Sequence, residues 1–230
     1  MLDDLKQQVY DANLRLLHER LVIQTFGNVS GIDRSSGRVV IKPSGVPYAA
    51  MTPADMVVVE LLAGAVVEGD LRPSSDTPTH LELYRSFPGI GGVVHSHSLH
   101  ATAWAQARRE IPALGTTHAD HFYGAVPVTR ILRPDEIETD YERNTGRVIV
   151  ERFEVIDPWD RPGVLVAGHG PFAWGADADD AVHNAVILEF VARLAAETLR
   201  LAPDADPIGE SLLDRHYLRK HGPEATYGQG

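Results

Sequence analysis

Short apolar segments of strand length occur in neighbouring pairs along this chain, and segments with helical periodicity separate the pairs. Residues 27–32 and 38–41 flank a turn at 34–37, and residues 56–62 are followed by another turn and a short strand around 64–68. Strands joined by such short connections pair antiparallel, because parallel pairing needs a long crossover. The pattern predicts an α/β chain: a layered fold with a central, mostly antiparallel or mixed β-sheet flanked by helices.

The remaining segments extend this prediction. Helical spacing of apolar residues predicts helices over residues 3–22, 77–87, 99–108, 134–145 and 177–201, and further strands are expected at 93–97, 126–129 and 164–167. The chain has no G-x-G-x-x-G running from a strand into a helix and no G-x-x-x-x-G-K-[ST], which argues against a doubly wound nucleotide fold. With 230 residues, we expect one domain over residues 1–230.

The charge and cysteine content narrow the possible partners. Lys and Arg number 21 against 32 Asp and Glu, giving a net charge of -11, so nucleic acid is not expected as a partner. The chain has no Cys, which excludes disulfides and thiolate metal ligands and agrees with a reducing cytoplasm. Acidic residues stand where a signal peptide would be basic, and no apolar run reaches membrane-spanning length. We therefore expect a soluble cytoplasmic protein without a membrane partner.

His95-Ser96-His97 follows two valines at the end of an expected strand. If residues 93–97 form a strand, both imidazoles project from the same face and can reach one cation. His169 stands between two glycines after another apolar strand, where a ring is displayed rather than packed, and is the candidate third ligand. His-x-His alone fits two unrelated histidines equally well. Of the remaining eight histidines, we expect four to lie exposed in polar loops: His118, His121, His216 and His221.

Three short clusters have the composition of anion-binding sites. Ser74-Ser75-Asp76 precedes a helix start, where hydroxyls and free N–H groups favour phosphate, and Asp76 could also ligate a metal or orient a histidine. Lys42-Pro43-Ser44-Gly45 combines a cation, a hydroxyl and a glycine after a strand, and Gly27-Asn28 adds an amide. Each cluster alone is an ordinary cap or turn. Together with a metal site they indicate a small phosphorylated substrate.

The order of these motifs along the chain is more specific than any one of them. Gly27-Asn28-Val29-Ser30, Lys42-Pro43-Ser44-Gly45, the segment from Ser74 to His80, His95-Ser96-His97, the segment from Thr116 to Asp120 and Gly168-His169-Gly170 together resemble the class II aldolase and ribulose-phosphate epimerase family over nearly the whole chain. Family aldolases typically place a glutamate where this chain has Asp76, so the resemblance favours an epimerase.

The resemblance implies a role for each matching residue. His95, His97 and His169 correspond to ligands of one Zn²⁺ per subunit, with Asp76 at or beside the metal. Asn28, Ser44, Gly45, Ser74 and Ser75 correspond to phosphate-binding positions, with Gly27 and Lys42 beside them. Asp120 and Tyr227 correspond to the proton donor and acceptor pair, which reaches the site from a neighbouring subunit, and Thr116, Glu142 and His216 correspond to supporting positions. The resemblance also implies a cyclic homotetramer with active sites at subunit interfaces.

The function implied by the resemblance is epimerisation of L-ribulose 5-phosphate to D-xylulose 5-phosphate at C4, in arabinose catabolism, by retro-aldol and aldol chemistry through an enediolate. Three alternatives stay open. A class II aldolase would cleave fuculose or rhamnulose phosphate at the same type of site. A zinc hydrolase would not need three phosphate clusters, and the chain has no H-E-x-x-H. A non-catalytic zinc-binding module would be expected to close its metal with four protein ligands.

Overall fold

The central element of the computed structural model, which describes residues 2–222 and 225, is one antiparallel sheet of seven strands. The strands are β1 (Asn28–Asp33), β2 (Arg38–Ile41), β3 (Val57–Glu60), β4 (Val66–Glu68), β5 (Gly92–His95), β6 (Gly163–Leu165) and β7 (Pro171–Gly175), in the order β4-β3-β2-β1-β5-β7-β6. Every strand pair in this sheet is antiparallel. The predicted layered α/β fold is therefore confirmed.

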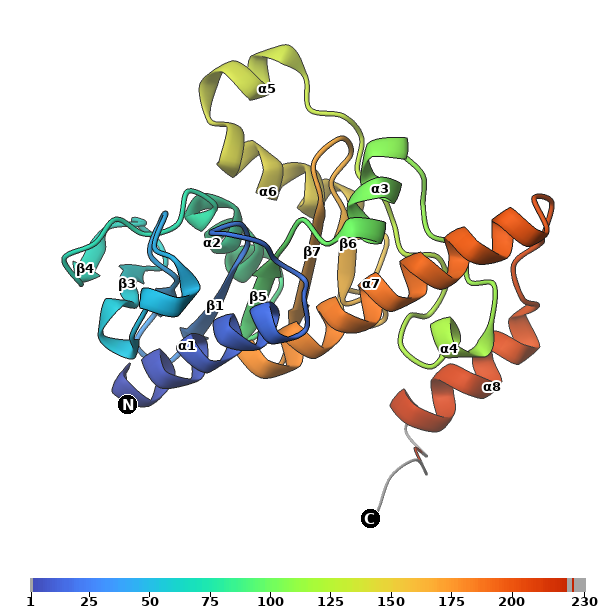
Figure 1. The fold of residues 1–230 in the computed structure, drawn as a ribbon, viewed down its shortest axis with the longest axis horizontal. Helices are drawn as coiled ribbons and strands as arrows, with labels where there is room; N and C mark the ends of the chain where they lie inside the picture. The colour runs from blue at the N-terminus through green and yellow to red at the C-terminus, as the bar shows by residue number, and fades with distance from the viewer. Residues whose placement is uncertain (1, 223–224, 226–230) are drawn as a thin grey trace.

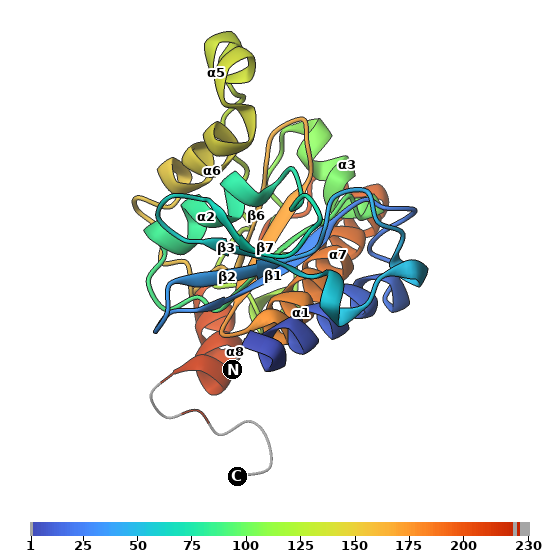
Figure 2. The ribbon, with the colours of Figure 1, turned by 90° about the vertical axis from the view of Figure 1, so that its left-hand side faces the viewer.

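Helices cover both faces of the sheet. Helix α1 (Leu2–His18) and the long α7 (Ala178–Leu201) pack on one face, and α2 (Thr77–Ser86) and α6 (Tyr141–Arg152) lie on the other (Figure 2). Successive strand residues alternate between the two layers: Val94 packs with the α1 and α7 side chains, whereas Val93 and Trp174 pack with those of α2 and α6. Both faces are apolar because both are buried.

The remaining helices lie at the borders of this sandwich. They are α3 (Leu99–Ala107), α4 (Thr116–Ala119), α5 (Pro134–Thr139), α8 (Glu210–His221) and two short 3₁₀ turns, η1 (Tyr48–Ala50) and η2 (Pro53–Asp55). Figure 1 shows α5 projecting from the body and α8 lying beside α4, which it contacts. Among the described residues, no helix has both the length and the apolar character needed to cross a membrane.

Several element boundaries differ from the predicted ones. The helix predicted over 3–22 ends at His18, because Arg20 and Gln24 adopt left-handed backbone angles with φ of 59° and 54°. The helix predicted over 134–145 is interrupted at Asp140, where φ is -138° and ψ is 62°. The predicted edge strand 126–129 forms only isolated bridges to Ile111 and Leu165.

Two differences concern the strands that carry the site. The strand predicted over 93–97 ends at His95, so His97 does not share a strand face with it and that part of the prediction is wrong. Strand β7 was not predicted at all. It pairs with β5 and aligns Phe172 with His95 and Trp174 with Val93.

Candidate active site

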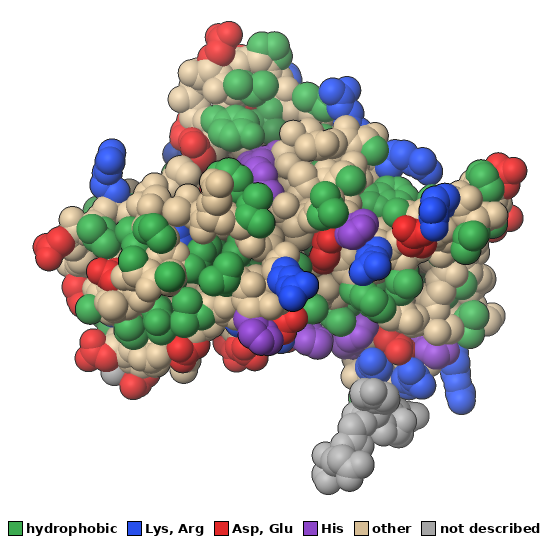
Figure 3. All heavy atoms as spheres, in the orientation of Figure 1, with side chains coloured by type: hydrophobic (Ala, Val, Ile, Leu, Met, Phe, Trp, Pro, Cys, Tyr) green, Lys and Arg blue, Asp and Glu red, His purple; other side chains and the backbone are tan. Residues whose placement is uncertain are grey.

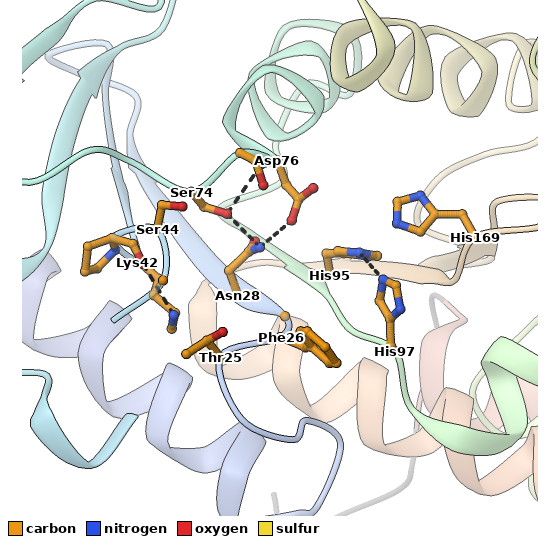
Figure 4. A pocket seen from close by; sticks show the side chains of 14 residues that line it. Thr25, Phe26, Asn28, Lys42, Ser44, Ser74, Asp76, His95, His97 and His169 are labelled. Carbon is orange, nitrogen blue, oxygen red and sulfur yellow. Dashed lines mark hydrogen bonds between the residues drawn. The ribbon is translucent and has the colours of Figure 1, made fainter. Parts of the chain in front are cut away.

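A cavity of about 370 Å³ opens where β1 begins and β5 ends, beside the start of α2. Its walls include eleven of the predicted site residues: Gly27, Asn28, Lys42, Ser44, Gly45, Ser74, Ser75, Asp76, His95, His97 and His169. Three further lining residues, Thr25, Phe26 and Pro43, were not predicted. In Figure 4 the three histidines lie at one end of this cavity and Lys42, Ser44 and Ser74 at the other, with Asn28 and Asp76 between them.

The three histidines converge. Each ring offers one nitrogen atom, and these three nitrogens, from His95, His97 and His169, lie within 4.8 Å of one another. The ring centroids are 4.7 to 5.1 Å apart. His95 is held in place on β5 by stacking on Phe172, with ring centroids 4.2 Å apart. His97 reaches the same point from the loop after the strand. Among the described residues this is a group that could hold a metal ion.

Two glycines allow His169 to approach the other two rings. His169 stands in the tight turn between β6 and β7, closed by the bond from Val166 N–H to Gly170 O, and Gly168 adopts a φ of +77°. A Cβ atom on Gly170 would lie 2.9 Å from the Ser96 carbonyl oxygen and 3.5 Å from both the His95 and His97 rings. The glycine therefore permits the close contact of this turn with the end of β5.

The hydrogen bonds of these rings suit a cation. His95 Nδ1 lies 3.0 Å from the Pro171 carbonyl oxygen, which can only accept, so Nδ1 donates and the neutral ring keeps a lone pair on Nε2. That Nε2 lies 3.1 Å from His97 Nε2. Two nitrogens bound to a tetrahedral zinc ion lie about 3.3 Å apart, given zinc–nitrogen bonds of about 2.0–2.1 Å. His169 Nδ1 contacts Tyr141 Oη at 3.3 Å, which leaves its Nε2 for the cation.

Burial favours the neutral form of His97 and His169. Burial and the neighbouring His95 and His97 lower the pKa of His169 to about 4, and burial together with His95 lowers the pKa of His97. Neutral imidazoles retain the lone pairs that metal binding requires. The donor set of three imidazoles beside a carboxylate fits a divalent transition metal such as zinc.

Asp76 lies beside the three histidines rather than within their group. Burial acts to raise the pKa of this carboxyl, but His95, His80, the Asn28 bond and His169 together outweigh burial and lower it, so the group is ionised. Its Oδ2 accepts a 2.7 Å hydrogen bond from Asn28 Nδ2. The carboxylate therefore adds negative charge next to the cation site.

Asn28 connects Asp76 to the anion end of the cavity. Its Nδ2 donates one hydrogen to Asp76 and the other to Ser74 Oγ at 3.0 Å, so both amide hydrogens are used within the protein. Ser74 Oγ also accepts from the Asp76 N–H at 3.4 Å. The hydroxyl hydrogen of Ser74 consequently remains available for a ligand. In this arrangement Asn28 orients Ser74 and Asp76, and its own amide has no hydrogen left for a phosphate.

Lys42 supplies a buried positive charge at the anion end. The residue is 2% exposed, and its Nζ donates to the Val46 and Pro43 carbonyl oxygens at 3.1 and 3.3 Å and lies 4.8 Å from the centre of the Tyr48 ring. Within the described part of the chain no carboxylate pairs with it. Burial lowers its pKa. A cation buried without a carboxylate is suited to receive an anion.

The remaining predicted residues do not line the cavity. Asp120 lies at the end of α4, where its carboxylate contacts His216 Nδ1 at 3.0 Å, Arg219 at 3.0 Å and Lys220 at 3.5 Å, all three on α8. Histidine, lysine and arginine side chains gather at this face of the molecule (Figure 3). Thr116 begins α4, and Glu142 lies in the first turn of α6. Tyr227 lies outside the described residues.

The expectation that four histidines are exposed in polar loops is wrong for three of them, whereas the fourth, His221, is exposed but lies on a helix. His118 is on α4 and only 4% exposed, with its Nε2 2.7 Å from the Gly124 carbonyl oxygen. His216 and His221 are on α8 and contact the Asp120 carboxylate and backbone, and His121 is half-buried beside His183. Helix α8 packs against α4, from which it is far apart in the sequence, and this packing brings His216 to Asp120.

Comparison with known proteins places the chain in a family. Residues 7–196 match the model described as class II aldolase and adducin N-terminal domain, so the chain belongs to this family and the predicted resemblance is confirmed. It is 58% identical over 225 residues to the L-ribulose-5-phosphate 4-epimerase UlaF of Salmonella paratyphi A (strain ATCC 9150 / SARB42) and to that of Salmonella typhi, covering 98% of each chain.

Solved structures show the same fold. An L-fuculose 1-phosphate aldolase aligns with a TM-score of 0.78 and 25% identity over 93% of this chain and 94% of its own. The L-fuculose-1-phosphate aldolase of Thermus thermophilus aligns with a TM-score of 0.67 and 24% identity over 89% of this chain and 98% of its own. The fold is therefore shared by proteins named as aldolases and by this chain, and the site must distinguish their reactions.

Proposed function

We propose that this protein is a zinc-dependent L-ribulose-5-phosphate 4-epimerase that forms D-xylulose 5-phosphate. The observation that carries the proposal is the cavity, in which three imidazoles and a phosphate-binding end share about 370 Å³. The 58% identity to curated epimerases over 98% of the chain supports L-ribulose 5-phosphate as the substrate. The proposal includes one Zn²⁺ per subunit, a single domain over residues 1–230 and a cytoplasmic homotetramer.

The chemistry of the substrate explains why such a cavity is needed. C4 of a 2-ketopentose carries no acidic hydrogen, so inversion proceeds through cleavage of the C3–C4 bond and its re-formation on the other face. The C4 hydroxyl loses its proton, the electrons of the C3–C4 bond pass to the three-carbon fragment, and glycolaldehyde phosphate is released within the cavity. A divalent cation held by His95, His97 and His169 would supply a Lewis acid for the negative charge that develops on the sugar oxygens.

The phosphate-binding end keeps the two-carbon fragment in place. Lys42 offers a buried positive charge, and Ser74 offers a hydroxyl hydrogen that no protein group uses in the described bonds. Ser44, in the loop after β2, and Ser75, just before the start of α2, lie exposed on the same cavity wall. The dipole of α2 favours an anion beside Ser75. A fragment tethered by its phosphate can turn its aldehyde over without leaving, which separates epimerisation from net aldol cleavage.

Asp120 and Tyr227 are the proposed proton-transfer pair. Burial acts to raise the pKa of Asp120, but His216, Arg219 and Lys220 outweigh burial and lower it, so the group is an anion able to accept a proton. Asp120 does not line the cavity of its own chain. We propose that it serves the cavity of a neighbouring chain, with Thr116, Glu142 and His216 as supporting residues.

A direct assay separates epimerase from aldolase. Purified protein with measured metal content is incubated with L-ribulose 5-phosphate, and D-xylulose 5-phosphate is measured with a coupling enzyme while dihydroxyacetone is followed in parallel. The proposal predicts D-xylulose 5-phosphate without net dihydroxyacetone. L-Fuculose 1-phosphate and L-rhamnulose 1-phosphate serve as comparison substrates, since the structural similarity to L-fuculose 1-phosphate aldolase makes aldol cleavage the second candidate function. Faster cleavage of either would refute the epimerase assignment.

A further inference from the structure

A buried hydrogen-bond chain lies behind the cavity, between β1 and α2. Ser30 Oγ is 2.7 Å from His80 Nδ1 and 2.8 Å from Tyr84 Oη, and all three side chains are at most 1% exposed. Ser30 follows Asn28 by two residues on β1, and His80 follows Asp76 by four residues on α2. These spacings place the Ser30–His80 pair next to the Asn28–Asp76 pair, on the same strand face and the same helix face.

The direction of this chain follows from counting buried donors and acceptors. In the described hydrogen bonds Ser30 Oγ is the partner of the Tyr84 hydroxyl, so the Tyr84 hydroxyl donates to Ser30, which then donates to His80 Nδ1. The opposite direction would leave the Tyr84 hydroxyl hydrogen without an acceptor in a buried place, at a cost of about 1–3 kcal/mol. His80 Nδ1 therefore accepts, and the ring proton is on Nε2.

Two buried groups in this layer have no hydrogen-bond partner among the described residues: His80 Nε2 and Asn28 Oδ1. One is a donor and the other is an acceptor, so their requirements are complementary. Asp76 adds a second acceptor, since it lies one helical turn before His80, whose backbone N–H donates to the Asp76 carbonyl oxygen at 3.1 Å. Buried polar groups are usually satisfied, and one internal water with two to four polar partners is a common way to do so.

We infer that His80 is a positioning residue, whose Nε2–H group donates across one internal water to the Asp76–Asn28 pair and fixes the carboxylate beside the three histidines. Ser30 and Tyr84 keep the ring in the tautomer that can donate. Loss of such an outer hydrogen-bond partner weakens metal binding or activity by about 10- to 100-fold. The inference rests on the proposed metal site and predicts that His80 acts on the metal only through Asp76.

A double-mutant cycle tests this route. His80→Asn keeps an acceptor at the Nδ1 position but lacks the Nε2 donor, whereas His80→Gln places an amide N–H near the Nε2 position. Zn²⁺ affinity of the full-length protein is measured by competition with a chromophoric chelator. We expect His80→Asn to weaken Zn²⁺ binding by about tenfold or more. We expect His80→Gln to remain within about twofold of wild type, and His80→Asn to change affinity by at most about twofold in an Asp76→Asn background.

The outcomes are distinguishable. Equal losses from His80→Asn in both backgrounds, or His80→Gln as weak as His80→Asn, would show that His80 does not act through an Nε2 donor on Asp76. If His80→Asn loses its far-UV circular dichroism, Ser30→Ala takes its place, with the same expected dependence on Asp76. Wild-type protein that binds no Zn²⁺ overturns the metal site and this inference together. Wild-type protein that binds Zn²⁺ and forms D-xylulose 5-phosphate, with additive mutants, overturns this inference alone.

Discussion

Replacing Lys42 with methionine should separate substrate binding from stability. Met keeps most of the apolar stem and removes the charge. In the free protein Lys42 Nζ has only carbonyl oxygens at 3.1 and 3.3 Å and the Tyr48 ring as partners, distances longer than those of strong charge-assisted bonds. Because burial already disfavours the charged form, as the lowered pKa indicates, we expect Lys42→Met to leave the free energy of unfolding unchanged or to raise it.

The effect on the reaction should have the opposite sign. A hydrogen bond to a charged group contributes about 1.5–3 kcal/mol. At about 1.4 kcal/mol per factor of ten, losing such a bond to the substrate phosphate corresponds to a fall of roughly 10- to 100-fold in kcat/KM. Steady-state conversion of L-ribulose 5-phosphate gives kcat/KM, and urea unfolding of the same preparations gives the free energy.

Lys6→Met is the matched control. Lys6 is also buried, but its ammonium pairs with Glu68 and the residue does not line the cavity. We expect its kcat/KM to equal that of wild type. Full kcat/KM in Lys42→Met, or a loss that merely follows a loss of folded protein, would refute the assignment of Lys42 to the phosphate end.

Two further predictions test the local geometry. Gly170→Ala puts a Cβ atom 2.9 Å from the Ser96 oxygen, so the turn that carries His169 must move and Zn²⁺ affinity should fall by about tenfold. Gly209→Ala is the control, because its Cβ has no neighbour within 4 Å, and it should bind Zn²⁺ as wild type does. Equal Zn²⁺ affinities in the two variants would contradict this prediction. Burial lowers the pKa of His118 from 6.5 to about 4, so below pH 6.5 the unfolded chain binds a proton that the folded chain does not, and stability falls as the pH falls toward 4. At about pH 5 this one group should lower the free energy of unfolding of wild type by about 2 kcal/mol. His118→Gln keeps a donor for the Gly124 oxygen but does not titrate, so between about pH 7.5 and 5 its free energy of unfolding should fall by about 2 kcal/mol less than that of wild type in urea titrations. The same pH dependence in both proteins would show that His118 does not titrate in this way.

The fold class was predictable because paired short strands leave few alternatives, but the exact strands were not. β7 begins with Pro171, ends with Gly175 and contains no β-branched residue, so Phe172 and Trp174 alone give a weak strand signal. Its pairing with β5 depends on tertiary contact. The segment 126–129 has the composition of a strand, yet Pro127 cannot donate to a ladder and only isolated bridges form. Tertiary pairing therefore made a strand where the local propensity was weak, at β7, and no strand where the propensity was strong, at 126–129.

The site was predictable where a motif carries its own geometry. The glycines around His169 indicated a displayed ring, and the structure brings that ring to His95 and His97. The predicted reason for the His95–His97 pairing was wrong, since the strand ends before His97. The use of both Asn28 hydrogens, and the Ser30–His80 pair behind the cavity, follow from the packing of α2 on β1 and leave no local pattern in the sequence.

The proposed dependence of the reaction on a cation held by three histidines is tested most directly by titrating Zn²⁺ into metal-stripped protein while following D-xylulose 5-phosphate. The proposed zinc dependence predicts that activity returns in proportion to bound Zn²⁺ and reaches its maximum at about one ion per chain, as expected for a single site. It also predicts that His97→Asn, at the same Zn²⁺ concentrations, neither retains the ion nor regains activity. Full conversion by metal-stripped protein, or by His97→Asn without bound metal, would contradict it.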